Sequence, residues 1–298
     1  HISKIIVSPK DPNTVFVASQ GPLWSSGGER GLYRTDNGGK TWKNVLSVNV
    51  WTGVTDILID PRNPNTLYAA TWDRHRTVAA LMGGGPGSGI YKSLDGGDSW
   101  KKLYRGLPND RDSNGDGEID EDDDPVINMG KIGLAISPQD PDVVYAAIEL
   151  QRTKGGVYRS ENQGESWKKM SDAVAGATGP HYYQELVASP HVFDKIYLMD
   201  TKVQVSENGG KDFYIMNAKQ FSLKVEEIKR NNGDMSYMDA ILHYCDENKI
   251  DPAEVGRYIS KSLKEKITIE AQGLNSVSYT HLRAHETEAD LVCRLLLE

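Results

Sequence analysis

The hydrophobic residues of this chain follow two different periods. From residue 5 to about residue 217, short apolar runs alternate with turns rich in Gly, Pro and Asn. Such runs predict antiparallel strands, because successive side chains of a strand face opposite sides of a sheet. Beyond residue 217 the apolar residues recur at helical spacing, which predicts three short helices. We therefore expect a mainly β chain that ends in a small α-helical segment.

One strand–turn–strand phrase occurs four times in the β-rich part. Each copy ends its first strand with Ser-Pro or Asp-Pro, since proline lacks the N–H that a strand ladder needs, and most continue through an Asn- or Asp-rich turn. The copies are IIVSPKDPNTVFVAS from Ile5, ILIDPRNPNTLYAAT from Ile57, LAISPQDPDVVYAAI from Leu134 and LVASPHVFDKIYLMD from Leu186. Repetition of this kind indicates an array of equivalent structural units.

A second phrase, also strand, turn and strand, follows each copy of the first. Its copies are GLYRTDNGGKTW ending at Trp42, GIYKSLDGGDSW ending at Trp100, GVYRSENQGESW ending at Trp167 and VQVSENGGKDF ending at Phe213. Two hairpins per repeat make four short antiparallel strands, which is the blade of a β-propeller. We expect a partial propeller of about four blades over residues 1–217.

The second phrase resembles the Asp-box of the BNR-repeat sialidases and of the sortilin-like (VPS10) propellers. The resemblance implies a folding element without catalysis: a polar side chain accepts N–H groups of the turn, glycine adopts positive φ, and an aromatic ring packs between blades. Asp95 keeps the acid of the motif, and Asn replaces it in the other boxes. The box positions are Thr35, Asn37, Gly39, Trp42, Ser93, Asp95, Gly97, Trp100, Ser160, Asn162, Gly164, Trp167, Ser206, Asn208, Gly210 and Phe213.

The two alternating phrases together resemble a bacterial family of large exported propeller proteins described as sortilin-like or glycosyl-hydrolase-like. Because most propellers close with more than four blades, we expect a fragment with two unpaired blade edges, a liability for aggregation. The opening HISKIIVSP also has the character of an internal segment. The resemblance implies an extracellular or periplasmic location for this part.

An acidic insertion at residues 109–124 separates the second and third repeats. Its core, DSNGDGEIDEDD, fits a calcium loop, in which oxygen ligands alternate along the chain and glycine at the sixth position allows a sharp turn. We predict one structural Ca²⁺, and the alternative is a solvated acidic loop without a cation. The predicted ligands are the side chains of Asp112, Asn114, Asp116, Asp120 and Asp123 and the backbone carbonyl of Glu118.

Composition and charge exclude several classes of function. The chain has 298 residues, 38% of them hydrophobic, and no apolar run approaches the ~18 residues of a membrane span. Its net charge of -8 argues against direct nucleic-acid binding through bulk positive charge. Both cysteines, Cys245 and Cys293, lie in the last quarter. The propeller part therefore has no thiol, which suits an exported protein and also suits many cytosolic ones.

Candidate chemistry stands outside the boxes and the calcium loop. Glycoside hydrolysis needs two carboxylates about 5–9 Å apart, and Asp56, Asp73, Glu149 and Glu185 are available, with Asp73 and Glu185 as weak catalytic candidates. The arginine triad of sialidases cannot be identified. Two loop clusters are candidates for ligand binding, and the alternative for both is hydrogen bonding between blades: Arg74, His75 and Arg76, and His181, Tyr182 and Tyr183. We favour a non-catalytic recognition scaffold for peptide or glycan, and the alternative is a fragment of a sialidase- or xyloglucanase-like glycoside hydrolase.

Residues 218–275 predict a small helical module. FSLKVEEIKRNN places Phe221, Val225 and Ile228 on one face, and Asp251 with Pro252 predicts the start of the third helix. The stretches SLKVEEIKR and SYMDAILHYCDENKIDPAEVGRYISKSLKEKI resemble the late-transcription coactivator of tailed phages. The resemblance implies RNA polymerase as partner and an intracellular source for this segment. The alternative is a helical extension of the propeller.

Residues 276–298 form a third segment of different character. VSYTHLRAHET, at residues 277–287, resembles the translation of a transposase-type sequencing adaptor. We therefore expect a non-natural tail, and a junction of two source genes near residues 217–221. The alternative is an amphipathic helix that ends in LVCRLLLE.

Overall fold

The structure is a computed structural model whose contacts divide the chain into two compact units, His1–Tyr214 and Ile215–Glu298. It describes residues 1–109, 128–150, 154–175, 184–215, 217–248, 252 and 255–274. The predicted calcium ligands, the cluster His181 to Tyr183 and the tail at residues 276–298 lie outside the described residues.

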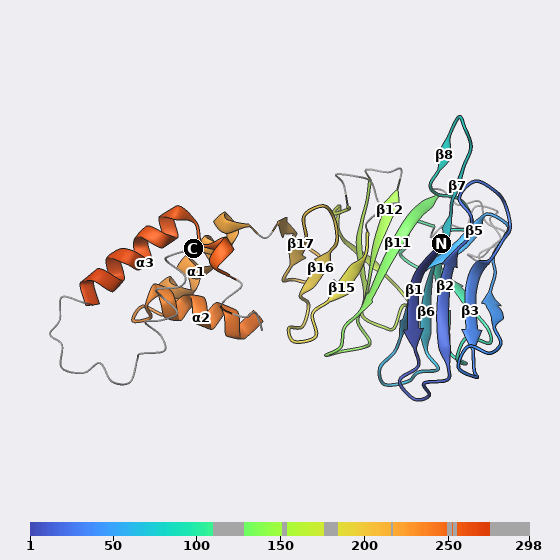
Figure 1. Ribbon diagram of the computed structural model, residues 1–298, viewed down its shortest axis with the longest axis horizontal. Helices are drawn as coiled ribbons and strands as arrows, with labels where there is room; N and C mark the ends of the chain where they lie inside the picture. Colours follow the sequence, from blue (N-terminus) through green and yellow to red (C-terminus); the bar gives the residue numbers. More distant parts are fainter. Residues whose placement is uncertain are drawn as a thin grey trace. The chain divides into compact units, whose positions relative to one another are not determined.

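The described part of the first unit contains four four-stranded antiparallel sheets, in each of which the strands pair in chain order (Figure 1). The first two sheets are β1 (Ile2–Val7), β2 (Val15–Gln20), β3 (Arg30–Thr35) and β4 (Lys43–Leu46), then β5 (Thr52–Ile59), β6 (Leu67–Asp73), β9 (Gly89–Ser93) and β10 (Lys101–Leu103). The next two are β11 (Met129–Ile136), β12 (Val144–Leu150), β13 (Lys154–Ser160) and β14 (Lys168–Ser171), then β15 (Leu186–Ala188), β16 (Ile196–Leu198), β17 (Gln204–Ser206) and β18 (Tyr214–Ile215). A separate hairpin, β7 (His75–Arg76) with β8 (Leu81–Met82), lies between β6 and β9. The predicted fold class, a partial propeller of about four blades followed by a helical segment, is confirmed.

The hydrophobic core of this unit lies between the blades. One cluster joins Phe16 and Leu32 of the first blade to Ile57 of the second, and further clusters join the second blade to the third and the third to the fourth. At the equivalent position of the innermost strand, Ile57 and Leu134 are fully buried, whereas Ile5 is 62% exposed. In each blade after the first, this position is therefore covered by the preceding blade.

A buried carboxylate links the innermost strands of three blades. Asp56 on β5 accepts a hydrogen bond from Lys4 Nζ on β1 at 2.6 Å and another from the backbone N–H of Leu134 on β11 at 2.8 Å. Burial raises the pKa of Asp56, and the Lys4 ammonium opposes that rise. Asp56, one of the carboxylates considered for catalysis, thus holds blades together.

The second unit contains α1 (Ala218–Asn231), α2 (Tyr237–Asn248), a short 3₁₀ helix (Gly256–Tyr258) and α3 (Lys261–Leu274). Asn217 caps α1, because its side-chain oxygen accepts the N–H groups of Lys219 and Gln220. Phe221 and Val225 are buried in the core of this unit, as the helical spacing predicts, and Ile228 packs against it. None of the described helices is long and apolar enough to cross a membrane.

The third long helix begins later than the Asp251–Pro252 signal predicts. Among the described residues after Pro252, Gly256–Tyr258 form a 3₁₀ turn, and α3 begins at Lys261, where Ser260 Oγ accepts the N–H of Leu263. Gly256 disfavours a continuous α-helix, and the hydroxyl of Ser260 supplies an N-cap beyond it. The prediction of the start was wrong for this reason.

Candidate functional site

All four Asp-boxes share one hydrogen-bonded turn. In the second box, Ser93 Oγ accepts the N–H of Gly97, and Asp95 Oδ1 accepts the N–H groups of Asp98 and Ser99. Hydrogen bonds from Ser99 hold the pKa of Asp95 well below its usual range. The glycine that follows the Asx by two residues has positive φ in every box, for example 91° at Gly97. These contacts are local to each turn, as expected of a folding element.

The aromatic residue that ends each box packs toward the preceding blade. Trp167 of the third box is buried in the cluster between the second and third blades, and Trp100 packs against the cluster between the first and second. Trp42 of the first box is 45% exposed. Ile5, which lies on the same uncovered side of the first blade, is exposed as well.

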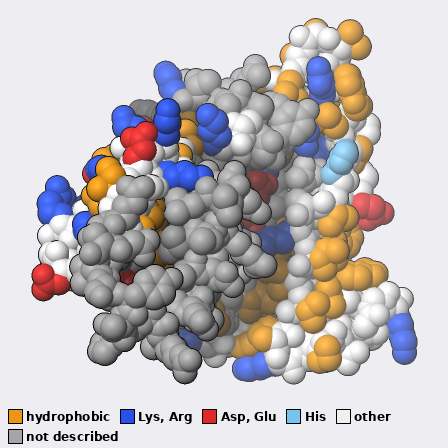
Figure 2. All heavy atoms as spheres, turned by 60° about the vertical axis from the view of Figure 1, so that its left-hand side comes forward, with side chains coloured by type: hydrophobic (Ala, Val, Ile, Leu, Met, Phe, Trp, Pro, Cys, Tyr) orange, Lys and Arg blue, Asp and Glu red, His pale blue; other side chains and the backbone are white. Residues whose placement is uncertain are grey.

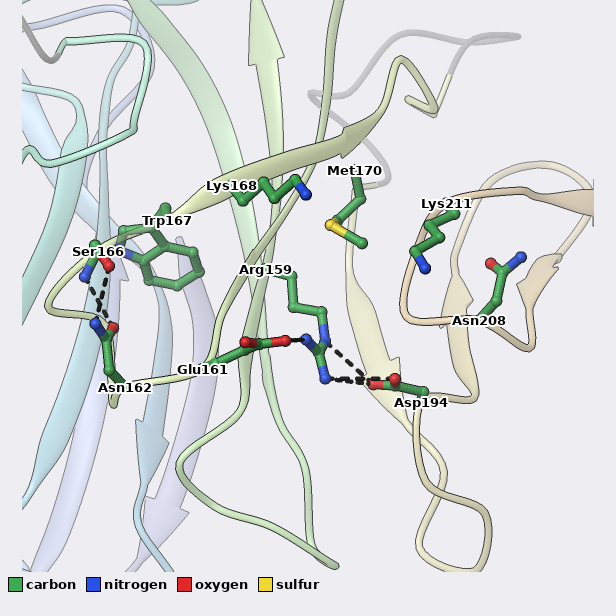
Figure 3. Close-up of a pocket in the computed structure, with 10 residues that line it drawn as sticks. All are labelled: Arg159, Glu161, Asn162, Ser166, Trp167, Lys168, Met170, Asp194, Asn208 and Lys211. Atoms are coloured by element: carbon green, nitrogen blue, oxygen red, sulfur yellow. Dashed lines mark hydrogen bonds and ion pairs between the residues drawn. The ribbon is translucent and has the colours of Figure 1, made fainter.

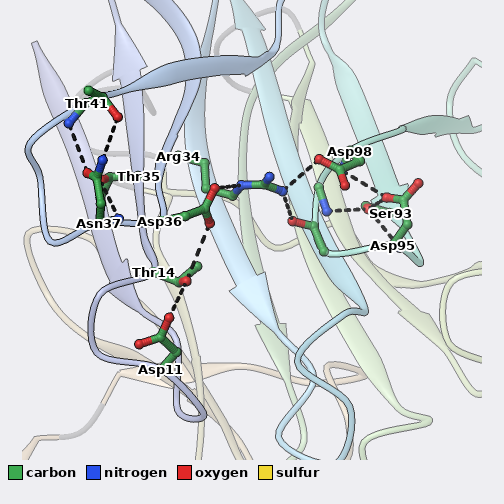
Figure 4. Close-up of polar contacts among 12 residues, drawn as sticks. Asp11, Thr14, Arg34, Thr35, Asp36, Asn37, Thr41, Ser93, Asp95 and Asp98 are labelled. Atoms are coloured by element: carbon green, nitrogen blue, oxygen red, sulfur yellow. Dashed lines mark hydrogen bonds and ion pairs between the residues drawn. The ribbon is translucent and has the colours of Figure 1, made fainter.

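In the first two blades, a cation just before the box connects the blade to the box of the next blade. Arg34 of the first blade pairs with Asp98 of the second box at 2.9 Å (Figure 4), and Lys92 of the second blade pairs with Glu165 of the third box at 2.7 Å. Asp98 and Glu165 occupy the same place, three residues after the Asx of their boxes. An inter-blade ion pair therefore closes the first two box-to-box junctions.

The third junction is built differently and contains a pocket. In the fourth box, Lys211 occupies the position that Asp98 and Glu165 hold in their boxes. Arg159 of the third blade pairs instead with Asp194 of the fourth blade and with Glu161 of its own blade. A pocket of about 460 Å³ opens here (Figure 3). We call it the inter-box pocket, and its lining is Arg159, Glu161, Asn162, Ser166, Trp167, Lys168, Met170, Asp194, Asn208 and Lys211.

The candidate residues Arg74, His75 and Arg76 each lie against a tryptophan. The guanidinium carbon of Arg74 lies 4.7 Å from the ring centre of Trp72, and that of Arg76 lies 5.3 Å from the ring centre of Trp24. The rings of His75 and Trp51 have centroids 4.3 Å apart. We call this set the tryptophan–arginine cluster: Trp24, Trp51, Trp72, Arg74, His75 and Arg76.

The tryptophan–arginine cluster joins loops of two blades at the base of the β7–β8 hairpin. The N–H of Arg76 donates to the carbonyl of Leu23, so the loop that carries Trp24 runs beside β7. The hairpin forms the uppermost projection in Figures 1 and 2, with hydrophobic and cationic side chains visible near its tip. Trp24 is 62% exposed and Val78 at the tip is fully exposed. This end of the blades therefore presents aromatic, apolar and cationic groups to solvent.

Asp73, the first catalytic candidate, is a buried residue at the end of β6. Desolvation raises the pKa of its carboxyl, and the neighbouring His75, the N–H of Gly87 and the charge of Arg30 oppose that rise. A carboxyl with a raised pKa is a suitable general acid. Asp73 thus has one property of a hydrolase residue.

Glu185, the second catalytic candidate, belongs to a different blade. Its carboxylate accepts a hydrogen bond from Lys131 Nζ at 2.6 Å and is half exposed. Glu149 is buried and accepts the N–H of Lys131. Each of these carboxylates has partners of its own, and Asp73 and Glu185 are separated by the whole third blade in the chain.

In the part of the chain that the structure describes, no group of three or more His, Cys, Asp or Glu side chains gathers around a possible metal position. The calcium loop at residues 112–123 lies outside it, so the predicted Ca²⁺ stays a prediction.

Sequence reasoning did not single out Lys211, Trp24 or Trp51. The charge reversal at Lys211 is visible when the four boxes are compared position by position. Trp24 and Trp51 have no such signal, because they meet Arg76 and His75 only through contacts between loops of two blades.

Comparison with known proteins separates the two parts of the chain. A sequence model of the phage late-transcription coactivator family matches residues 214–287. Xyloglucanase Xgh74A of Acetivibrio thermocellus is 30% identical over 145 residues, which are 47% of this chain and 15% of that protein. This chain therefore spans a small part of the xyloglucanase's length.

Solved structures of propeller proteins are also similar to this chain. The GH74 enzyme of Niastella koreensis has 14% identity and a TM-score of 0.48, over 70% of this chain and 29% of its own. Ycf48 bound to D1 peptide has 13% identity and a TM-score of 0.39, over 72% of this chain and 54% of its own. The chain is thus similar to propellers of the GH74 and Ycf48 types and, at its C-terminal end, to phage coactivators.

Proposed function

We propose that the propeller unit is a recognition module that binds a peptide or glycan through the tryptophan–arginine cluster and does not turn it over. The observation that carries the proposal is the 62% exposure of Trp24 beneath the guanidinium of Arg76. A large exposed ring offers apolar contact area, and a stacked arginine offers hydrogen-bond donors that stay oriented. Tryptophan and arginine are the residue types that dominate binding energy at interfaces.

The shape of the surrounding surface supports the same proposal. The exposed Val78 extends the apolar surface along the β7–β8 hairpin, while Arg74 donates to Gln20 Oε1 at 2.8 Å and so joins the two blades at its base. A ligand that contacts the hairpin and Trp24 together would cover apolar groups that now face water.

Binding to arrays of glycans and of peptides tests this proposal. Ligands that bind the whole chain should lose about tenfold or more in affinity with Trp24→Ala and with Arg76→Ala, a loss of about 1.4 kcal/mol. Trp42→Ala is the matched control, because Trp42 is also an exposed tryptophan of the first blade but belongs to its box. Equal losses in all three variants, or binding that none of them changes, would refute the role of the tryptophan–arginine cluster.

The predicted calcium loop and the exported location belong to the same proposal. A loop with ligands Asp112, Asp116 and Asp123 would hold Ca²⁺ as a structural brace of the insertion. Calorimetric titration with calcium should give one binding site that Asp116→Ala removes. Heat no larger than dilution at millimolar calcium would exclude it.

A glycoside hydrolase is the second candidate function for the propeller unit. The raised pKa of Asp73 favours it, because a protonated carboxylic acid is needed to protonate the leaving oxygen. The 30% identity to a xyloglucanase favours xyloglucan as the class of substrate for such a hydrolase. Under this alternative, Asp73 would act as the acid and Glu185 as the second carboxylate.

For the helical unit we propose binding to RNA polymerase. The match of residues 214–287 to the phage coactivator family supports this proposal. Co-purification with RNA polymerase should be lost when the buried core residue Val225 is replaced by Asp, which unfolds the unit. Retention of the polymerase by that variant would contradict the proposal.

A further inference from the structure

We propose that the inter-box pocket binds the carboxylate of an Asp or Glu side chain from an acidic peptide. That carboxylate would take the place that Asp98 and Glu165 occupy at the first two box-to-box junctions. The pocket is separate from the tryptophan–arginine cluster, so the inference extends the proposed recognition function to a second site.

The inter-box pocket exists because this junction lacks the box-to-box ion pair of the other two. At the other two junctions a cation of one blade, Arg34 or Lys92, meets an acid of the next box at 2.9 Å or 2.7 Å. At the third junction Lys211 stands in the acid's position and repels Arg159. The box-to-box ion pair of the other junctions is therefore missing, Arg159 pairs instead with Asp194 of the fourth blade, and about 460 Å³ stays open.

Arg159 nevertheless stays beside the fourth box. A Cβ atom added at Gly209 of that box would lie 3.2 Å from Cδ of Arg159. The guanidinium is held by Asp194 and Glu161, and its side chain is only 11% exposed (Figure 3). The cation is therefore fixed in place before any ligand arrives, which lowers the entropic cost of binding.

The lining of the pocket carries more cationic than anionic side chains. Lys168 on β14 and Lys211 in the fourth box line it, and neither has an ion-pair partner within the described residues. Three cationic side chains thus face two anionic ones, Glu161 and Asp194. Figure 3 shows Lys211 extending from its turn toward Arg159. The surplus positive charge favours an anionic ligand.

The other two junctions indicate which kind of anion fits the pocket. The groups that fill the equivalent place elsewhere in the molecule are Asp and Glu side chains presented by a tight turn. Met170 adds apolar surface for the methylene groups of such a side chain. An acidic peptide matches all of these features.

Fluorescence titration of the whole chain with an Asp- and Glu-rich peptide tests the inference. The comparison peptide carries Asn and Gln at the same positions, and polygalacturonate serves as an acidic glycan. Lys211→Glu restores the acid of the sister junctions and should weaken binding of the acidic peptide at least tenfold. Lys40→Glu is the matched control, because Lys40 has the same place in the first box, on the uncovered side of the first blade.

The outcomes are distinguishable. Binding of the acidic peptide alone, lost in Lys211→Glu and kept in Lys40→Glu and Arg76→Ala, supports the inference. Equal affinity for the acidic and amide peptides, preference for polygalacturonate, or indifference to Lys211→Glu overturns it. None of these three results tests ligand binding by the tryptophan–arginine cluster. That binding is tested separately by Arg76→Ala in the array experiment.

Discussion

Asp95 carries a carboxylate where the other three boxes have the amide of Asn37, Asn162 or Asn208. Both groups present an oxygen to the N–H four residues later, for example Asn162 Oδ1 to Ser166 at 2.9 Å. The two side chains therefore build the same turn. They differ in that only the carboxylate makes the turn sensitive to acid.

The lowered pKa of Asp95 predicts a dependence of stability on pH. Because the folded pKa lies below the value of about 3.9 for unfolded aspartate, ionised Asp95 stabilises the fold above that value. The contribution is lost as the pH falls toward the folded pKa. Asp95→Asn should remove it and keep the turn, so the melting temperatures of the two proteins should converge in acid.

Asn162→Asp is the reciprocal variant. It places a carboxylate in a box that has Ser166 where the second box has Ser99, and it should gain the acid sensitivity that Asp95→Asn loses. Thermal melts between about pH 7 and pH 3 record both effects, since this range spans the unfolded pKa. A difference between wild type and Asp95→Asn that stays constant with pH would contradict this explanation.

At the scale of elements, the strands were predictable and the start of the third helix was not. Each blade has its own turn signals, which are Ser-Pro or Asp-Pro after the first strand and a glycine turn before the last. Its strands can therefore be predicted from local sequence. The helix after Asp251 depends on competing local signals, a Pro start and a later Ser260 cap with Gly256 between them. Tertiary packing decides which of these signals starts the helix. That packing cannot be predicted from the hydrophobic pattern alone.

The helical unit has a core of its own, which predicts separate unfolding. Phe221 is buried and meets Tyr244 edge-to-face, with ring centroids 5.3 Å apart. Phe221→Ala should destabilise this unit by about 3 kcal/mol. Chemical unfolding followed by circular dichroism should show the helical transition shifted and the β transition unchanged. A shift of both transitions together would contradict independent cores.

At the scale of the whole molecule, the repeats predicted the blades but not the ligand surfaces. The tryptophan–arginine cluster depends on Trp24 and Arg76 meeting across two blades, and the inter-box pocket depends on how Arg159 lies against the next box. Both are relations between blades. A sequence repeat predicts each unit, whereas the contacts that make one junction unlike another become evident only in three dimensions.

The uncovered face of the first blade predicts association in solution. Ile5 and Val7 are 62% and 53% exposed on β1, and the equivalents of Ile5 in the later blades are buried against a neighbour. Apolar sheet faces of this kind favour intermolecular contact. Size-exclusion chromatography with light scattering should show concentration-dependent association that Ile5→Lys reduces. Val78→Lys, at the exposed hairpin tip, is the control, and equal association of Ile5→Lys and wild type would contradict the prediction.

The central claim is that the propeller unit recognises a ligand and does not hydrolyse one. Calorimetry with xyloglucan as the probe tests it most directly, because turnover gives sustained heat flow whereas binding gives heat that ends at each injection. The predicted result is the absence of sustained heat flow in the wild-type chain and in Asp73→Asn alike. Sustained heat flow in the wild type that Asp73→Asn abolishes would contradict the claim and establish a glycoside hydrolase.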